Sequence, residues 1–213
     1  MEHGDLPGVS RKRASRQAVF LNLPYDAQFE RLCFAYICAV ASFGLIPRAT
    51  LEIPGTRRLD RILELIEECP FSLHDLSRVQ LSPPVPRLPR FNMPFELGLA
   101  VVWQRRSRNK HLWYVFETRR YRVERSLSDL AGTDIYIHGG TIQGVIAQVS
   151  NAFIRGKRKP TFPEMLTVYR TLRAALPSIL AKSGSSTVFE GARAFRDVCL
   201  SAADIASDLI RQP

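Results

Sequence analysis

Short apolar runs alternate along the chain with longer segments that repeat their apolar residues every three to four positions. The short runs are rich in aromatic, aliphatic and β-branched side chains, which favour buried strands. The longer segments predict helices that bury one face. We expect strands at Ala18–Leu21, Ile46–Leu51, Phe71–Leu73, Leu112–Phe116 and Asp134–His138. We expect helices at Ala27–Phe43, Arg57–Cys69, from Asn92 onward, at Tyr121–Leu130 and at Thr141–Ile154.

The regular alternation of strand and helix predicts an α/β domain with a parallel sheet covered by helices on both faces. For five strands we expect a flavodoxin-like, three-layer fold with the strand order 2-1-3-4-5. In such sheets ligands bind beyond the carboxyl ends of the strands, where the strand order reverses. That point lies here between the first and the third strand.

The pattern divides the chain into three parts. Residues 1–17 are polar and basic and are expected to form a flexible arm, and residues 18–155 form the α/β domain. Residues 156–213 are expected to be a helical appendage, with helices at Thr161–Ala181 and Thr187–Leu209. An apolar stripe on the first of these helices must be buried, either against the domain or in a homo-oligomer. The stripe consists of Leu166, Tyr169, Leu172, Leu176 and Leu180.

The formal net charge of +10 is unevenly distributed. The segment Arg105–Arg125 contains eight Lys or Arg residues and two Glu residues, and Arg155–Lys159 is a second basic run. Such patches bind nucleic acid, anionic lipid or nucleotide phosphates, or they form a solvated rim. Base-stacking aromatics would favour nucleic acid, but Trp113, Tyr114 and Phe116 fit a buried strand better. We therefore favour a solvated rim and expect neither nucleic acid nor membrane as a partner.

The four cysteines have no CxxC spacing and lie inside apolar segments. We interpret them as buried thiols in a reducing cytoplasm and expect neither a zinc site nor another metal centre. The beginning of the chain lacks the apolar core of a secretory signal, and no segment has ~18 consecutive apolar residues, so we expect a cytoplasmic protein without a membrane span.

The stretch Leu88–Ala100 contains the most informative polar residue. The proline-rich residues Ser82–Arg90 are expected to be extended, and Asn92 is expected to cap the following helix. Glu96 lies four residues after Asn92 and is expected on the same helix face. There the positive end of the helix dipole would favour its ionised form at a solvated helix start. The face expected to pack inward carries Phe95, Leu99 and Val102.

Three polar clusters converge on the predicted crevice. They are the loop Asn22–Asp26 after the first strand, the loop His74–Ser77 after the third strand, and the helix start that carries Glu96. Glu96 and Asp75 are the candidate catalytic residues. Candidates for substrate binding are Asn22, Tyr25, Asp26, Ser77, Arg78, Arg90 and Asn92.

Several of these positions have equally plain structural interpretations. Asp75 could cap a turn, and Asn22 could brace its loop. His74 and Asp75 alternate, so one of them faces away from the crevice, and a packed histidine is the favoured interpretation of His74. Arg48 could contact a phosphate, although a surface ion pair is favoured. The arginines that flank the crevice, Arg78 and Arg90, are better phosphate ligands because guanidinium matches phosphate with two hydrogen bonds.

The segment Asn92–Ala100 resembles the glutamate-bearing helix start of nucleoside 2-deoxyribosyltransferases. The layout is also similar to that of Toll/interleukin-1 receptor (TIR) domains, which carry a catalytic glutamate on the helix after strand three. The blocks Asn22–Asp26, His74–Arg78 and Leu88–Asn92 resemble an uncharacterised bacterial TIR-like group. The resemblance covers about residues 18–155.

The resemblance implies cleavage of an N-glycosidic bond in a nucleoside or nucleotide, with NAD as the first candidate substrate and no separate cofactor. Glu96 would then be the nucleophile or the anion that faces an oxocarbenium-like sugar. A role in bacterial antiphage defence is a further implication. The alternative is a non-enzymatic nucleotide-sensing or protein-assembly module, because fold alone does not decide function.

Overall fold

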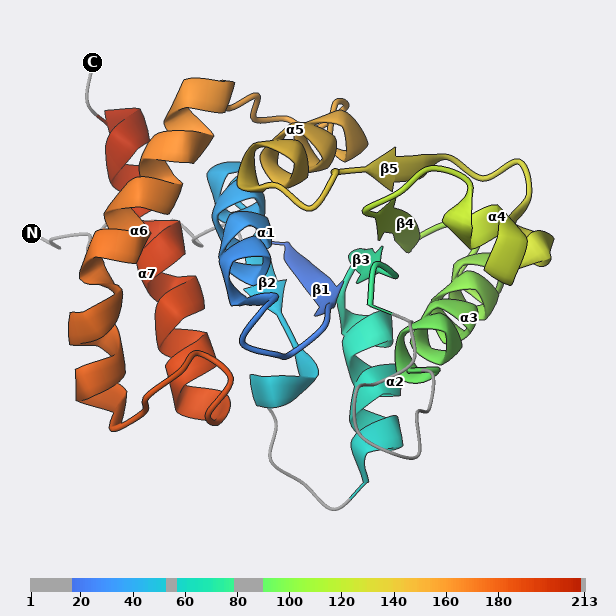
Figure 1. Cartoon of the computed structure of the whole chain (residues 1–213), viewed down its shortest axis with the longest axis horizontal. Helices are drawn as coiled ribbons and strands as arrows, with labels where there is room; N and C mark the ends of the chain where they lie inside the picture. The colour runs from blue at the N-terminus through green and yellow to red at the C-terminus, as the bar shows by residue number, and fades with distance from the viewer. Residues whose placement is uncertain (1–16, 53–56, 79–89, 212–213) are drawn as a thin grey trace, which may run out of the picture.

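The computed structural model describes residues 17–52, 57–78 and 90–211. Five parallel strands form one sheet in the order β2-β1-β3-β4-β5, which confirms the predicted order and the flavodoxin-like α/β fold (Figure 1). The strands are β1 (Ala18–Asn22), β2 (Ile46–Arg48), β3 (Phe71–Asp75), β4 (Leu112–Glu117) and β5 (Ile135–Ile137).

Helices cover both faces of the sheet. Helices α1 (Glu30–Ser42) and α5 (Ile142–Ala152) pack on one face with Leu21, Leu73 and Phe116. Helices α2 (Arg58–Glu68) and α3 (Asn92–Arg106) pack on the other face, against Phe20. The remaining elements are α4 (Arg122–Ser126), α6 (Phe162–Ser183), α7 (Ala192–Arg211) and two short 3-10 turns at Thr50–Glu52 and Ser128–Leu130.

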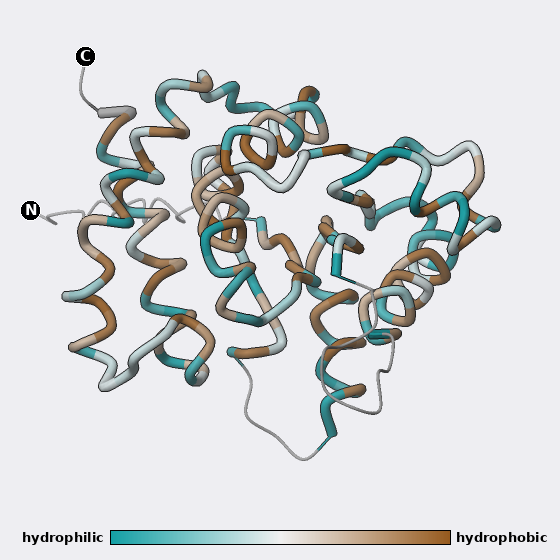
Figure 2. Tube along the Cα trace, in the orientation of Figure 1, coloured by the Kyte–Doolittle hydropathy of each residue, from teal (hydrophilic) through white to brown (hydrophobic). Residues whose placement is uncertain are grey.

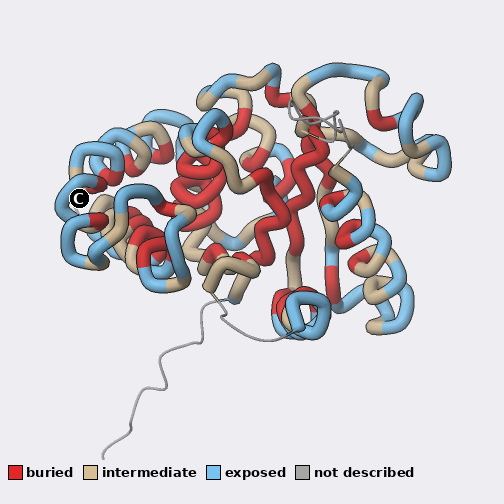
Figure 3. The backbone as a smooth tube through the Cα atoms, turned by 60° about the horizontal axis from the view of Figure 1, so that its bottom comes forward, coloured by how far each residue is buried: buried red, intermediate tan, exposed pale blue. Residues whose placement is uncertain are grey.

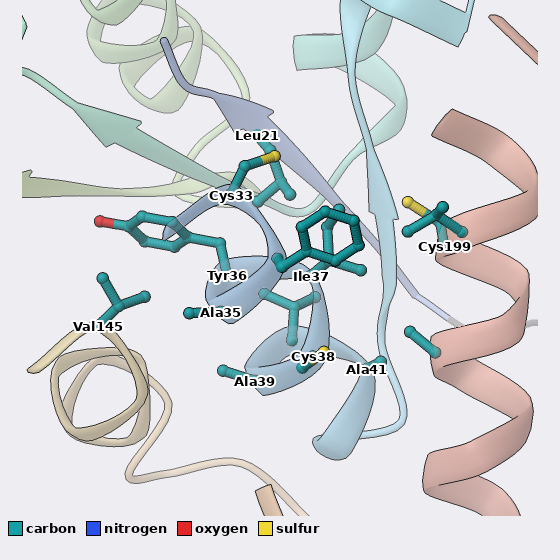
Figure 4. Close-up of a cluster of buried hydrophobic side chains, with 14 of the residues drawn as sticks. Leu21, Cys33, Ala35, Tyr36, Ile37, Cys38, Ala39, Ala41, Val145 and Cys199 are labelled. Atoms are coloured by element: carbon teal, nitrogen blue, oxygen red, sulfur yellow. The ribbon is translucent and has the colours of Figure 1, made fainter. Parts of the chain in front are cut away.

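Helix α1 is the centre of the larger core. Every residue from Leu32 to Ser42 is buried (Figure 3), because α5, α6 and α7 all contact this helix in addition to the sheet. A helix enclosed on all sides is apolar all round rather than amphipathic. Figure 4 shows the result: side chains of α1 point toward Leu21 of β1, Val145 of α5 and Cys199 of α7.

The apolar stripe of α6 is part of this same core. Leu172, Leu176 and Leu180 are buried in it, and Leu166 and Tyr169 pack against it. The prediction left two partners open for the stripe, the α/β domain and a second copy of the chain. In the structure the stripe packs against the α/β domain. Helices α6 and α7 lie side by side next to α1 (Figure 1).

Helix α3 is turned differently from the prediction. The prediction had Phe95 and Val102 facing inward, but both are exposed, and the buried residues of α3 are Met93, Glu96, Leu97 and Ala100. On α2 the apolar pattern includes Ile62 and Ile66, which are buried, but also Leu59 and Leu63, which are exposed. Helix α3 carries apolar residues on two faces, so periodicity alone did not identify the buried one (Figure 2).

Two predicted elements are shorter than expected. Strand β2 ends at Arg48, whose Nε donates to Glu52 Oε2 at 2.8 Å, while the backbone N–H of Ala49 donates to Glu52 Oε1. These bonds favour a 3-10 turn over a longer strand and confirm the ion pair expected for Arg48. The helix predicted at residues 121–130 is divided into α4 and a 3-10 turn, and Tyr121 before it has a left-handed backbone with φ of 62°.

The four cysteines are buried free thiols, as predicted. Among the described helices, none combines the length and the hydropathy that a membrane span requires. Within residues 17–52, 57–78 and 90–211, no group of three or more His, Cys, Asp or Glu side chains is arranged to hold a metal ion. The predicted arm, residues 1–17, lies outside the described residues except for Gln17.

Candidate functional site

Glu96 lies on the buried face of α3, beyond the carboxyl ends of the central strands. Glu96 is only 4% exposed. The prediction of a solvated carboxylate at the start of the helix was therefore wrong. Burial raises the pKa of Glu96 to about 7, and the nearby Arg58 partly opposes this effect. The cost of burying the charge thus exceeds the helix-dipole effect that was expected to favour ionisation.

Asn92 does not behave as predicted. It is the first residue of α3 and does not cap it, because the N-cap position is Phe91, which makes no side-chain hydrogen bond there. Asn92 is also exposed, whereas Glu96 one turn later is buried. Residues four apart share a helix face, but Asn92 lies at the exposed end of that face, before the part of it that is buried. Asn92 is therefore not brought together with the buried carboxyl group.

Asn22 fixes the start of α3 relative to the sheet. Its side-chain Nδ2 donates a hydrogen bond to the carbonyl oxygen of Met93 at 3.0 Å, and it lies 2.9 Å from His74 Nδ1. Met93 is three residues before Glu96, so this bond ties the end of β1 to the turn that presents the carboxyl group. The bracing role that the sequence left open for Asn22 is the one that the contacts support.

His74 belongs to a buried chain of hydrogen bonds on the same face. Because Nδ1 accepts from Asn22, the proton of the neutral ring is on Nε2, which donates to Ser72 Oγ at 2.8 Å. Ser72 in turn donates to His111 Nε2, and His111 Nδ1 donates to the carbonyl of Cys69 at 2.7 Å. Burial lowers the pKa of His74 to about 3. His74 is a packed, neutral histidine, as the favoured interpretation held.

Tyr25 is a close electrostatic neighbour of Glu96. Its hydroxyl donates to the carbonyl of Leu21 at 3.0 Å and is hydrogen-bonded by the side chain of Thr50. Burial raises the pKa of Tyr25 far above its ordinary value, with a further contribution from Glu96, and Arg58 acts in the opposite direction. The charge of Arg58, the first residue of α2, thus lowers the pKa of both Tyr25 and Glu96.

The cations predicted to bind phosphate are paired with an acid at the rim. Asp26 Oδ2 accepts from Arg78 at 3.2 Å and from Arg90 at 3.0 Å. Its other oxygen accepts from the backbone N–H of Phe29 ahead of α1. One carboxylate thus ties together the loops that follow β1 and β3 and the residues before α3. Two arginines against one aspartate leave one net positive charge at this edge.

Asp75 lies in a separate network on the opposite face of the sheet. It is fully buried, and it accepts hydrogen bonds from the Tyr36 hydroxyl at 2.8 Å and from the backbone N–H and the hydroxyl of Ser77. His138 Nε2 lies 3.2 Å from Asp75 Oδ2. Gly140 donates its backbone N–H to His138 Nδ1, so the proton of a neutral His138 is on Nε2 and faces the aspartate.

The structure therefore brings together only some of the predicted residues. Asn22, Tyr25 and Glu96 share one neighbourhood, and Asp26, Arg78 and Arg90 form its rim, whereas Asp75 and Ser77 lie in the network with Tyr36 and His138.

Sequence reasoning did not identify Arg58 and Thr50 as site residues. It placed Arg58 in the expected helix Arg57–Cys69 and Thr50 in the expected strand Ile46–Leu51. Their position between β2 and α2, beside the switch point of the sheet, was the signal that could have identified them. Most of the predicted extended segment Ser82–Arg90 lies outside the described residues.

Comparisons with known protein families, with curated proteins and with solved structures found no match for this chain. The fold and the contacts of the site therefore carry the functional reasoning.

Proposed function

We propose that this protein cleaves the N-glycosidic bond of a nucleotide, with NAD as the first candidate substrate, and that Glu96 is the catalytic carboxylate. The observation that carries the proposal is the burial of Glu96 beyond the carboxyl ends of β1 and β3, next to Tyr25 and Arg58. A buried carboxyl group with a perturbed pKa in such a position is typical of active sites. The resemblance to the deoxyribosyltransferase and TIR-like families supports the same assignment.

The chemistry requires a fixed negative charge near the sugar. As the bond between C1′ and the base nitrogen breaks, both bonding electrons leave with the base, and positive charge develops on the ribose carbon. The Glu96 carboxylate stabilises that charge or bonds to C1′ for a time. Water then forms the new C1′–O bond and releases a proton. In NAD the nicotinamide nitrogen is cationic and becomes neutral on leaving, so the reaction needs no general acid.

The raised pKa of Glu96 fits a cationic substrate. A carboxyl group with a pKa of about 7 is only partly ionised in the free protein at neutral pH. A pyridinium ring bound beside it lowers that pKa, because a nearby opposite charge favours the ionised form. Substrate binding thus generates the carboxylate that the reaction uses. A neutral nucleoside lacks this effect, which favours a cationic nucleotide over a free nucleoside.

Other residues of the neighbourhood take supporting roles in this proposal. Arg58, at the positive end of α2, is placed to attract the phosphates of a nucleotide. Asn22 holds the first turn of α3 through the Met93 carbonyl and is a positioning residue. Asp75, which is buried on the other face, is assigned to holding the loop after β3 rather than to catalysis.

The test compares Glu96→Gln with Glu64→Gln, an exposed glutamate of α2 that serves as the matched control. The purified proteins are incubated with NAD and a panel of nucleosides, and the released base is measured by chromatography. We expect base release from NAD by the wild type and by the control. Glu96→Gln should be slower by ~10²–10³-fold, the usual effect of losing one preorganised electrostatic group. Full activity of Glu96→Gln would eliminate the proposed role, and nucleotide binding without turnover by the wild type would favour the sensing module.

A further inference from the structure

A cavity of about 450 Å³ opens at the opposite edge of the sheet from Glu96. It lies at the amino ends of the central strands, where Gln17 precedes β1, Leu45 precedes β2 and Phe71 begins β3. The connection between α5 and α6 closes its other side. Its volume is within the range of small-molecule sites, and the proposed catalytic function does not use it.

One wall of this cavity is aromatic. The ring centroid of Phe153 lies 5.5 Å from that of Phe43 and 5.3 Å from that of Phe71. Phe43 and Phe71 are only partly buried, so the structure leaves part of this aromatic surface uncovered within the cavity. Rings of this kind bind flat heteroaromatic groups such as nucleobases by stacking.

The other side of the cavity is basic. Arg155, Lys157 and Arg158 line it, and none of the described residues that line it is acidic. Arg158 donates to the carbonyl of Ala206 in α7 at 3.1 Å, which holds this connection in place. Arg155 and Lys157 are exposed and line the cavity.

The basic charge exceeds what the nearby helix ends neutralise. Helices α1 and α5 both end at this cavity, and each carboxyl end of a helix carries about half a negative charge. These two ends offset about one of the three charges of Arg155, Lys157 and Arg158, so about two positive charges are left over. A purely structural role for the three cations, as partners of the helix ends, would leave no such surplus.

We propose that this cavity is a binding site for a mononucleotide, with its phosphate on Arg155 and Lys157 and its base on Phe43 and Phe71. The combination of an aromatic wall and a positive surplus matches a ligand that carries both a flat ring and a phosphate. The volume accommodates one nucleotide, which favours a small ligand over a nucleic-acid strand. The inference is independent of the catalytic role of Glu96, because the two sites lie at opposite ends of the strands.

The test uses AMP as the probe and titrates it into protein that carries Glu96→Gln, so that any turnover is slowed. The double variant Arg155→Gln/Lys157→Gln is compared with Arg170→Gln/Lys182→Gln, which removes the same charges from exposed positions of α6. We expect the first pair to weaken AMP binding at least tenfold and the second pair to change it less than twofold. Phe43→Leu should weaken AMP binding while leaving the affinity for inorganic phosphate unchanged.

An AMP affinity that is unchanged in Arg155→Gln/Lys157→Gln would overturn the proposal. So would equal binding of inorganic phosphate and AMP, or binding of a single-stranded oligonucleotide that is more than tenfold tighter than that of AMP. If the double variant does not fold, photo-crosslinking of the wild type with 8-azido-AMP decides. Label on the peptides that contain Phe43 or Phe153 supports the site, and label confined to the peptides around Tyr25 and Glu96 excludes it. Base release from NAD is measured separately, so the AMP-site proposal and the proposed role of Glu96 can be rejected independently of each other.

Discussion

The side-chain amide of Asn22 donates a hydrogen bond to the carbonyl oxygen of Met93 at 3.0 Å and so joins the end of β1 to the first turn of α3. Asn22 is 3% exposed, and the same Nδ2 also contacts His74. A single buried amide therefore positions the helix turn that carries Glu96.

Replacing Asn22 with Leu should affect both stability and activity. The change removes the donor and leaves the Met93 carbonyl and His74 Nδ1 buried without their partner, which costs about 1–3 kcal/mol. It also releases the start of α3, so base release should fall through the rate constant more than through KM. Urea unfolding and steady-state kinetics measure the two effects. Asn151→Leu, at an exposed position of α5, is the control and should change neither quantity.

Glu96→Gln should stabilise the protein at alkaline pH. The pKa of Glu96 is about 7 in the folded protein against an ordinary value of 4.5, so the fold favours the protonated form. The contribution to stability is fully present below pH 4.5 and is lost as the pH rises toward 7, by about 3 kcal/mol in all. Glutamine does not titrate and escapes this loss.

The measurement is the free energy of unfolding of the wild type and of Glu96→Gln between pH 4.5 and pH 8.5. The difference between them should grow with pH in favour of Glu96→Gln and level off above pH 7. A difference that is constant over this range would show that Glu96 is ionised at its ordinary pKa, as a solvated carboxylate would be.

The strand order could be predicted because alternating strands and helices allow few arrangements of a five-stranded sheet. The buried face of α3 could not be predicted, because Phe95 with Leu99 and Val102, and Met93 with Leu97 and Ala100, both have helical spacing. The choice between them depends on packing against β3 and β4, which is a long-range property.

The site was predictable only in part for the same reason. The convergence of Asn22, Tyr25 and Glu96 followed from the topology, since all three belong to segments that meet at the switch point. Which of His74 and Asp75 faces this neighbourhood depends on the strand pleat, and two adjacent polar residues at a strand end give no periodicity to resolve it. The burial of Glu96 depends on which face of α3 packs inward. Because that face was not predicted, the burial of Glu96 was not predicted either.

Phe95 and Leu97 test how α3 is turned. Phe95 is 54% exposed, whereas Leu97 is 2% exposed and packs with Leu76, Val115 and Val123. Leu97→Ala should cost about 2–5 kcal/mol through lost burial and a cavity, and Phe95→Ala should stay within about 0.5 kcal/mol of the wild type. Chemical denaturation of the two variants gives both values. A larger loss of stability in Phe95→Ala than in Leu97→Ala would support the orientation of α3 that the apolar pattern alone predicted.

Helices α6 and α7 should be required for folding of the α/β domain. They cover the side of α1 that the sheet does not, and Leu172 of α6 is fully buried in the shared core. A chain that ends after Gly156 would expose this apolar side of α1, so we expect it to lose cooperative unfolding or to aggregate. Near-ultraviolet circular dichroism and size-exclusion chromatography detect both outcomes.

A pair of point variants tests the same relationship without truncation. Leu172→Ala should lower the free energy of unfolding by about 2–5 kcal/mol, because it opens a cavity between α6 and α1. Arg170→Ala, two residues earlier on the exposed side of α6, should change it by less than about 0.5 kcal/mol. An independent appendage would behave differently. Its truncation would leave a well-folded domain, and Leu172→Ala would destabilise the helices α6 and α7 while the unfolding transition of the α/β domain stayed where it was. A single transition that shifts as a whole in Leu172→Ala establishes that both parts share one core.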